Sequence, residues 1–286
     1  MDTVDDLETE IAAEARSDEN VRVQAGSYVL ELSLDWIALR ASENIHHLLR
    51  QSHVTLIDEP LGKFVHAQAL HDLRNLFSKL SGTTGIGRAY AVRLTDDHDL
   101  VDIAFQLSDG RVLLEAVPSA GCFGECLGSV GGLIAGLANS RGQALLDGGA
   151  RRMRALTGYD RVTVTCGDRR SESSRGAFAS FSNCAGLPML IANSEAAGTG
   201  VFPREVDETS IKAALMREPS EEERRRLKQQ GIRALLRVPF DGWGLVCEFC
   251  CESRTSREPN FELHAAAELF AQMFAMRLAI DEAANH

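Results

Sequence analysis

The chain has 286 residues, of which 44% are hydrophobic and 25% are charged, and its formal net charge is −11. This length accommodates two domains of ordinary size. The acidic balance argues against nucleic acid and anionic membranes as partners, because both are bound through an excess of Lys and Arg. No apolar run is long enough to span a bilayer, and residues 1–20 lack the apolar core of a signal peptide. We therefore expect a cytoplasmic protein whose seven cysteines are free thiols.

The first half of the chain predicts two strands, several short helices and then three more strands. The expected strands are Tyr28–Ser33, Trp36–Arg40, Ala89–Thr95, Val101–Leu107 and Arg111–Val117. Asp109-Gly110 is a two-residue hairpin signal between the last two of them. Ser42 is placed to cap a short helix over Glu43–Arg50, and apolar residues recur at helical spacing within Asp58–Leu80.

The second half of the chain begins with a segment rich in glycine, Pro118–Gly136, which indicates a boundary between domains. Helices are expected over Ala138–Thr157, from the capping box at Ser220–Glu223 to Gly231, and over Phe261–Ala284. The expected strands are Arg161–Cys166, Ala177–Ser182, Ile232–Phe240 and Trp243–Cys250. The pattern predicts an α+β protein with two domains, each a central antiparallel sheet flanked by helices.

Four runs in the expected order resemble the PAS–GAF photosensory module of bacterial phytochromes. They are Ala41-Ser-Glu-Asn44, Leu156-Thr-Gly-Tyr-Asp-Arg-Val162, Leu227–Ala234 followed by Trp243-Gly-Leu-Val246, and Phe261-Glu-Leu-His-Ala-Ala-Ala-Glu-Leu269. The abundance of Asp, Glu and Ala in residues 1–20 predicts a flexible acidic arm there. The resemblance implies a PAS-like domain at 21–118. It further implies a Gly-rich linker at 119–137 and a GAF-like domain at 138–286 that ends in a long helix.

The chain departs from this family at the residues that hold a bilin chromophore. The first cysteine is Cys122, after the PAS-like domain, whereas the family's biliverdin-binding cysteine precedes that domain. The helix that carries a cysteine and a histidine in other members reads Ser220-Glu-Glu-Glu223 here. The family's tyrosine is replaced by Thr165, only Asn183–Pro188 stands at its pyrrole-binding segment, and its cysteine–histidine strand end reads Cys247-Glu-Phe-Cys-Cys251.

These departures favour a truncated and divergent module. The candidate pocket residues are Tyr159, Thr165, Cys184, Glu223, Cys247 and Phe249. We expect no covalent bilin, because no cysteine precedes Cys122 and because Glu222 and Glu223 stand in the helix where other members carry a cysteine and a histidine. These carboxylates would also repel the propionates of a bilin if they faced the cavity. The interpretation is a non-enzymatic sensory protein without its own output domain, which signals through a separate kinase or regulator. Two alternatives stay open: a photoreceptor that binds biliverdin without a covalent bond, and a haem or tetrapyrrole sensor or enzyme with a remodelled GAF pocket.

The cysteines and histidines are the candidate ligands of a metal ion or a haem group. Cys247 and Cys251 share one face of a strand and Cys250 lies on the other, which does not suit one tetrahedral zinc ion, so no metal site is expected. The candidate ligands of a haem-binding PAS domain are His46, His47, His66 and His71. A histidine is more often a surface or hydrogen-bonded residue than a haem ligand.

The closing helix carries an apolar band that is wide for a helix covering one sheet. Phe270, Phe274 and Leu278 recur at a spacing of four residues. We expect them to form the interface of a homodimer in a parallel helix bundle. The alternative is that the helix at Ala138–Thr157 covers this band within one chain.

Overall fold

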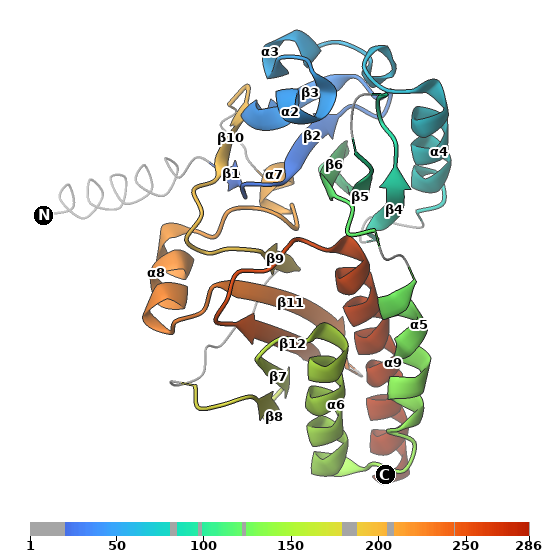
Figure 1. Ribbon diagram of the computed structural model, residues 1–286. Coiled ribbons are helices and arrows are strands. Elements are labelled where there is room, and N and C mark those ends of the chain that lie inside the picture. The colour runs from blue at the N-terminus through green and yellow to red at the C-terminus, as the bar shows by residue number, and fades with distance from the viewer. Residues whose placement is uncertain are drawn as a thin grey trace, which may run out of the picture.

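The computed structural model describes residues 21–80, 85–96, 99–121, 124–178, 188–204, 209–242 and 244–285. It confirms the predicted α+β class: two antiparallel sheets form the upper and lower halves of the molecule (Figure 1). Within these ranges, no helix is both long and apolar enough to cross a bilayer.

The first sheet has seven strands in the order β1-β10-β3-β2-β6-β5-β4. The strands are β1 (Arg22–Val23), β2 (Tyr28–Leu32), β3 (Ala38–Ser42), β4 (Gly87–Val92), β5 (Val101–Ser108), β6 (Arg111–Pro118) and β10 (Thr199–Phe202). The helices are η1 (Glu43–Ile45), α2 (His46–Leu49), α3 (His53–Leu56), η2 (Leu61–Lys63) and α4 (Ala67–Phe77). Leu70 and Leu73 of α4 pack against Phe105 of β5 in the core of this half.

Local signals determine most of this half. Asp109 and Gly110 both have positive φ, 51° and 73°, as the tight hairpin between β5 and β6 requires. Trp36 has a φ of 65°, so the turn after β2 extends through it and β3 begins at Ala38, two residues later than predicted. The Ser42 hydroxyl does not cap a helix as expected, because it accepts a hydrogen bond from the Val29 N–H at 3.0 Å instead.

The second sheet has five strands in the order β8-β7-β12-β11-β9. These are β7 (Arg161–Cys166), β8 (Arg169–Ser174), β9 (Met189–Ile191), β11 (Ala234–Asp241) and β12 (Val246–Ser253). The helices are α5 (Glu125–Ala135), α6 (Gly142–Thr157), α7 (Thr209–Lys212), α8 (Glu221–Gln229) and α9 (Phe261–Asn285). Helices α5, α6 and α9 lie side by side on one face of the sheet (Figure 1). We call this face the helical face and the other the polar sheet face.

The predicted helix ends of the second half are confirmed. Gly158 ends α6 with a φ of 67°, and Ser220 and Glu223 form the predicted capping box of α8. The expectation for α9 was wrong in one respect. Phe270, Phe274 and Leu278 are at most 2% exposed and lie in the core of a single chain, so they are not available to a dimer partner. Helix α6 reaches them because Gly149 has no side chain: a Cβ there would lie 2.5 Å from the Phe274 ring.

Two predicted segments differ in local structure. Residues 119–137 contain the helix α5, which packs against α9, although its glycines indicated a linker. The strand beside β7 is β8, which follows a turn with Gly167 at a φ of 56°, and it was missed. Ala177 and Phe178 are not in a strand, and the remainder of the strand expected at 177–182 lies outside the described residues. The division into domains at 118 and 138 stays a prediction.

Strand β1 and Gln24, which follows it, connect the two halves at the edge of the first sheet. Strand β1 pairs with β10 on one side and bridges to Arg217 on the other, so it lies between two segments that come more than 150 residues later in the chain. Gln24 is 4% exposed, and its amide donates to the carbonyls of Leu190 (2.6 Å) and Arg217 (3.0 Å). Its carbonyl accepts from the Ala192 N–H at 2.8 Å. One side chain thereby satisfies three buried backbone groups.

Glu115, in the middle of the first sheet, binds the segment that contains Arg217. Its carboxylate accepts hydrogen bonds from the N–H groups of Leu215 and Met216, both at 2.8 Å. Gln106 adds a bond to the Ala213 carbonyl at 2.8 Å. Burial nonetheless raises the pKa of Glu115 to about 7.

This pKa predicts a pH-dependent stability. The folded state holds the Glu115 proton more tightly than the unfolded chain, so the stabilisation is fully present below about pH 4.5 and is lost as the pH rises through about 7. A difference of this size corresponds to a contribution of order 3 kcal/mol. Urea unfolding across this range should therefore show a free energy that falls with pH, with a clearly smaller slope in Glu115→Gln. Part of the slope remains in the variant because burial also raises the pKa of Glu268. An unchanged slope in Glu115→Gln contradicts the assignment.

Candidate functional site

The polar sheet face is built by strand alternation. Side chains two residues apart point the same way, so alternate residues of three adjacent strands gather on this side of the sheet. They are Arg161, Thr163 and Thr165 of β7, Glu248, Cys250 and Glu252 of β12, and Arg237 of β11. A face with four charged side chains among seven needs internal pairing, because burying an unpaired charge is costly.

The first ion pair joins opposite residues of adjacent strands. Arg161 and Glu252 are register partners, their side chains are 2% and 1% exposed, and the Arg161 Nε donates to a Glu252 oxygen. The Arg161 guanidinium also lies 4.5 Å from the centre of the Phe178 ring, and that of Arg254 lies 4.2 Å from it. Phe178 therefore meets two cations at the edge of this face.

The second group of charges centres on Arg237, whose side chain is 4% exposed. Its guanidinium lies 3.7 Å from a Glu223 carboxylate oxygen and 4.0 Å from one of Glu248. Glu223 also accepts the Ser220 N–H at 3.1 Å, so the capping box of α8 holds it in position beside the sheet. Leu227 of the same helix packs on Leu235 and Cys250, which closes an apolar cluster next to the ion pairs.

The threonines of β7 provide hydroxyl groups between these pairs. Thr163 is fully buried, and its hydroxyl has no hydrogen-bond partner among the described residues. Thr165 is half-buried and lies opposite Glu248. The face therefore offers one unsatisfied hydroxyl and guanidinium groups that are already neutralised by carboxylates.

The structure divides the predicted pocket residues between two faces. Thr165 and Glu223 lie on the polar sheet face. Tyr159, Cys247 and Phe249 lie in the core of the helical face, each at most 1% exposed, so their assignment to one pocket was wrong. Burial raises the pKa of the Tyr159 hydroxyl, and the Arg257 guanidinium packs over its ring at 4.4 Å. Cys184 lies outside the described residues.

The residues considered for metal and haem sites are also separated. Cys247 and Cys251 belong to the helical core and Cys250 to the cluster on the other face, as strand alternation predicts. The described residues contain no group of three His, Cys, Asp or Glu side chains placed to hold a metal ion. His46, His47 and His71 are exposed and His66 is half-buried, 3.2 Å from Asp96, so none of these four lies in the core of the first half.

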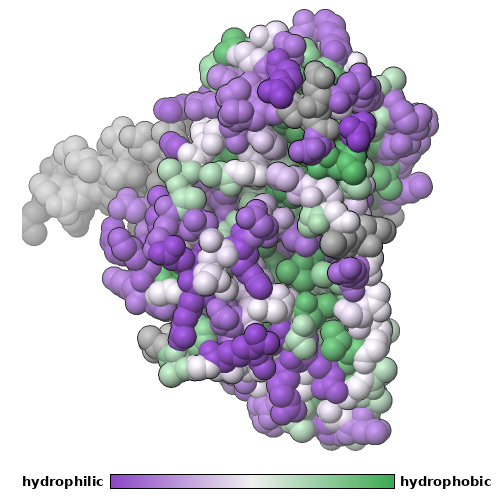
Figure 2. Space-filling model, in the orientation of Figure 1, coloured by the Kyte–Doolittle hydropathy of each residue, from purple (hydrophilic) through white to green (hydrophobic). Residues whose placement is uncertain are grey.

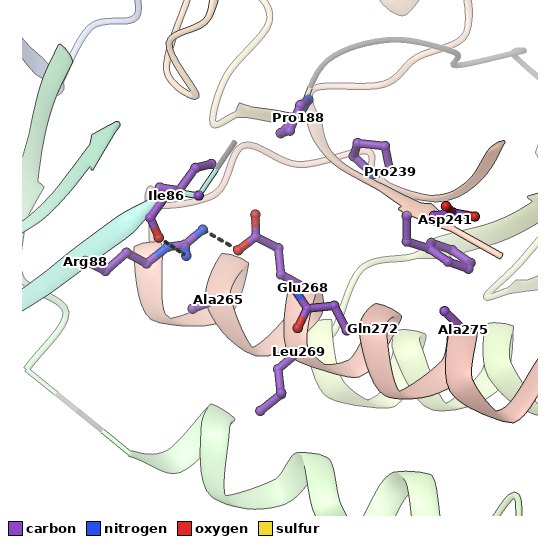
Figure 3. Close-up of a pocket in the computed structure, with 12 residues that line it drawn as sticks. Ile86, Arg88, Pro188, Pro239, Asp241, Ala265, Glu268, Leu269, Gln272 and Ala275 are labelled. Carbon is purple, nitrogen blue, oxygen red and sulfur yellow. Dashed lines mark hydrogen bonds and ion pairs between the residues drawn. The ribbon is translucent and has the colours of Figure 1, made fainter. Parts of the chain in front are cut away.

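Sequence reasoning missed a second candidate site, a cavity of about 680 Å³ where the two halves meet (Figure 3). Arg88 of β4 and Glu268 of α9 meet at one end, and Pro239 and Asp241 of β11 lie at the other. Gln272 projects from α9 along its wall. A cleft between two halves with a few convergent polar groups is a common setting for small ligands.

Arg88 links the halves electrostatically. Its Nη2 donates to the Nδ1 of His264 at 2.6 Å and to a Glu268 oxygen at 2.7 Å. Burial and the adjacent guanidinium lower the pKa of His264 well below its ordinary value. The imidazole is therefore neutral, with its proton on Nε2, a buried atom without a partner among the described residues. No local signal identifies this cluster, because Arg88 and His264 are 176 residues apart.

Comparisons with known proteins support the fold. No protein-family model and no curated protein matches the sequence. The chromophore-binding domain of an unusual bacteriophytochrome from R. palustris matches with a TM-score of 0.74 and 19% identity, over 93% of this chain and 97% of that one. The chromophore-binding domain of a Stigmatella aurantiaca phytochrome matches with the same score and identity, over 91% and 98% of the two chains. The photosensory core module of a Stigmatella aurantiaca phytochrome also matches at 0.74, with 20% identity, over 92% of this chain and 58% of that one.

The chain has the fold of a bacteriophytochrome chromophore-binding domain. The resemblance of the four sequence runs is thereby confirmed at the level of fold. The assignment of the first half as PAS-like and the second as GAF-like stays a prediction. At 19–20% identity, the residues of the polar sheet face have to be interpreted from their own chemistry.

The buried pair on this face predicts a characteristic mutational pattern. Glu252→Ala leaves the Arg161 charge buried and unbalanced, which should lower the free energy of unfolding by about 3–5 kcal/mol. Replacing both residues, as in Arg161→Met with Glu252→Leu, should recover most of this loss, and urea unfolding measures each step. The control is Glu221→Ala, which removes the exposed ion pair between Glu221 and Arg225. It should change the free energy of unfolding by less than about 1 kcal/mol. A Glu252→Ala effect as small as the control contradicts the buried pairing.

Proposed function

We propose that the chain is a non-enzymatic, phytochrome-like sensory PAS–GAF protein whose polar sheet face does not hold a covalently attached bilin. The observation that carries the proposal is the neutralisation of Arg161 by Glu252 and of Arg237 by Glu223 and Glu248. A bilin brings two propionates, which bind most strongly to guanidinium groups free of other carboxylates. Here the propionates would meet carboxylates already in place.

The described cysteines also support this proposal. A thioether requires a thiol that the chromophore can reach. Cys250 is the described cysteine on the polar sheet face, and it is 3% exposed beneath Leu227 and Leu235. Cys166, Cys247 and Cys251 are buried on the helical face.

Co-expression with biliverdin tests the proposal. We expect no fluorescent band after zinc staining of a denaturing gel, because no described thiol is exposed on the polar sheet face. A band contradicts the proposal, and repeating the gel with Cys184→Ala and Cys122→Ala identifies the attachment residue. Absorption spectra separate the alternatives: red absorption without a band supports a non-covalent biliverdin photoreceptor, and a Soret band after haem addition supports a haem protein. Either spectrum favours that alternative over the proposed function.

We further propose that α9 passes the sensory state to a second copy of the chain and to a separate output protein. Its face away from the core carries Leu269, Met276 and Ile280, which are 39%, 67% and 53% exposed. Their spacing of seven and four residues places them on one stripe of the helix. Apolar residues gather along the surface where α9 and α5 lie, within a mostly polar surround (Figure 2). An exposed stripe of this kind favours packing against another helix.

Light scattering tests the dimer. We expect a mass of two chains for the wild type and of one chain for Met276→Glu, because a charge in the stripe would be buried in the interface. Leu34→Glu is the matched control: Leu34 is 59% exposed but lies in the turn after β2, so its replacement should leave the mass unchanged. A wild type with the mass of one chain excludes the dimer.

A further inference from the structure

Cys166 and Cys247 form a pair of thiols that the functions above do not use. They are direct register partners on the antiparallel strands β7 and β12. Both are 1% exposed and lie at the end of the helical core, next to the turn at Gly167 and the hairpin tip at Gly242. Both are free thiols in this structure.

The surroundings of Cys247 favour its thiolate. The Cys166 S–H donates to the Cys247 sulfur, and the Arg169 guanidinium is near. The Gly242 N–H, which donates to the Leu245 carbonyl at 2.9 Å, also interacts with this sulfur. These contacts lower the pKa of Cys247, and the hydrogen bond raises the pKa of Cys166; burial and the nearby Asp241 carboxylate oppose the effect on Cys247. The approach of the hairpin backbone depends on glycine: a Cβ at Gly242 would lie 2.4 Å from the Cys247 sulfur.

The strand geometry suits a disulfide. Opposite residues of antiparallel strands have Cα atoms about 4.5–5.5 Å apart, within the range of about 4.4–6.8 Å that disulfides span. Their Cβ atoms are about 4.5–5.5 Å apart, at or beyond the upper end of disulfide geometry. A bond between them therefore forms without a change of register but under strain, and strained disulfides are the ones that are easily reduced.

We propose that Cys166 and Cys247 are a reversible redox pair that closes to a disulfide on reaction with a peroxide. The Cys247 thiolate attacks one oxygen of hydrogen peroxide, the O–O bond breaks, and the second oxygen leaves as hydroxide, which takes up a proton to become water. Cys247 is then a sulfenic acid. The Cys166 sulfur attacks the Cys247 sulfur, releases its proton and expels the hydroxyl group as a second water. A small dithiol reverses the step by thiol–disulfide exchange.

The other described cysteines are poorly placed to compete. Cys250 points to the polar sheet face, Cys251 lies opposite Val162, and Cys126 is on α5. The peroxide has to enter at the rim of the core, beside the half-exposed Leu245 of the hairpin tip. This leucine lies 3.7 Å from the point that a Cβ on Gly167 would occupy. Leu278 of α9 lies 3.7 Å from the point that a Cβ on Gly242 would occupy, so closure fixes the paired ends of β7 and β12 beside this helix.

Peptide mapping after oxidation tests the pair. The protein carries Cys122→Ala and Cys184→Ala so that the described cysteines alone react, and it is treated with hydrogen peroxide. We expect the loss of two free thiols per chain, a mass lower by two hydrogens, and a trypsin fragment that joins residues 162–169 to 238–254, all reversed by dithiothreitol. Cys166→Ala and Cys247→Ala should each abolish the linked fragment, whereas Cys250→Ala and Cys251→Ala should retain it. A linked fragment that survives Cys247→Ala, or thiols that stay reduced, overturns the proposal.

A charge variant tests the role assigned to Arg169 without touching the cysteines. Arg169→Gln should slow the loss of thiols severalfold, because the guanidinium favours the Cys247 thiolate. Arg170→Gln is the matched control: Arg170 is adjacent in β8, lies opposite Thr165, and faces the polar sheet face. Equal rates for the two variants contradict the assigned role of Arg169.

Discussion

The Gln24 amide is the interaction on which the arrangement of the two halves depends. It binds carbonyl or N–H groups of Leu190, Ala192 and Arg217, so a residue next to the first strand fixes the backbone of the second half. A buried amide that lost these partners would leave several polar groups unsatisfied, each at a cost of about 1–3 kcal/mol. Strand β10 pairs with β1 beside this contact, and Glu115 binds Leu215 of the segment that follows β10.

Strand alternation decides the chemistry of the candidate site. Cys247 and Phe249 were expected in a pocket with Thr165, but β12 places its odd-numbered residues against α9 and its even-numbered residues against Arg161 and Arg237. The same rule, applied to the sequence, separated Cys250 from its neighbours correctly. The pocket residues were carried over from family motifs that differ in this chain, whereas the parity of a strand follows from backbone geometry alone.

Elements with local signals were predictable from the sequence, and elements that depend on distant partners were not. The capping box at Ser220, the end of α6 at Gly158 and the hairpin at Asp109 each need only a few adjacent residues. Strand β10 exists because it pairs with β1 and β3, which lie more than 150 residues away. Helix α5 forms despite its glycines because α9 covers it and the Glu262 carboxylate accepts N–H bonds from its first turn. The junction cluster of Arg88 and His264 depends on the same kind of distant pairing.

Helix α9 is the element through which these distant contacts meet. Its first turn binds α5 through Glu262, and its next turns bind Arg88 of the first half through His264 and Glu268. Phe274 fills the space left by Gly149 of α6, and Leu278 packs near the Cys247 thiol at the beginning of β12. A displacement at the junction, on the sheet or at the thiol pair therefore has to move the same rigid helix. Because close-packed cores shift between discrete arrangements rather than deform gradually, α9 is suited to carry a change from any of these places to its exposed stripe.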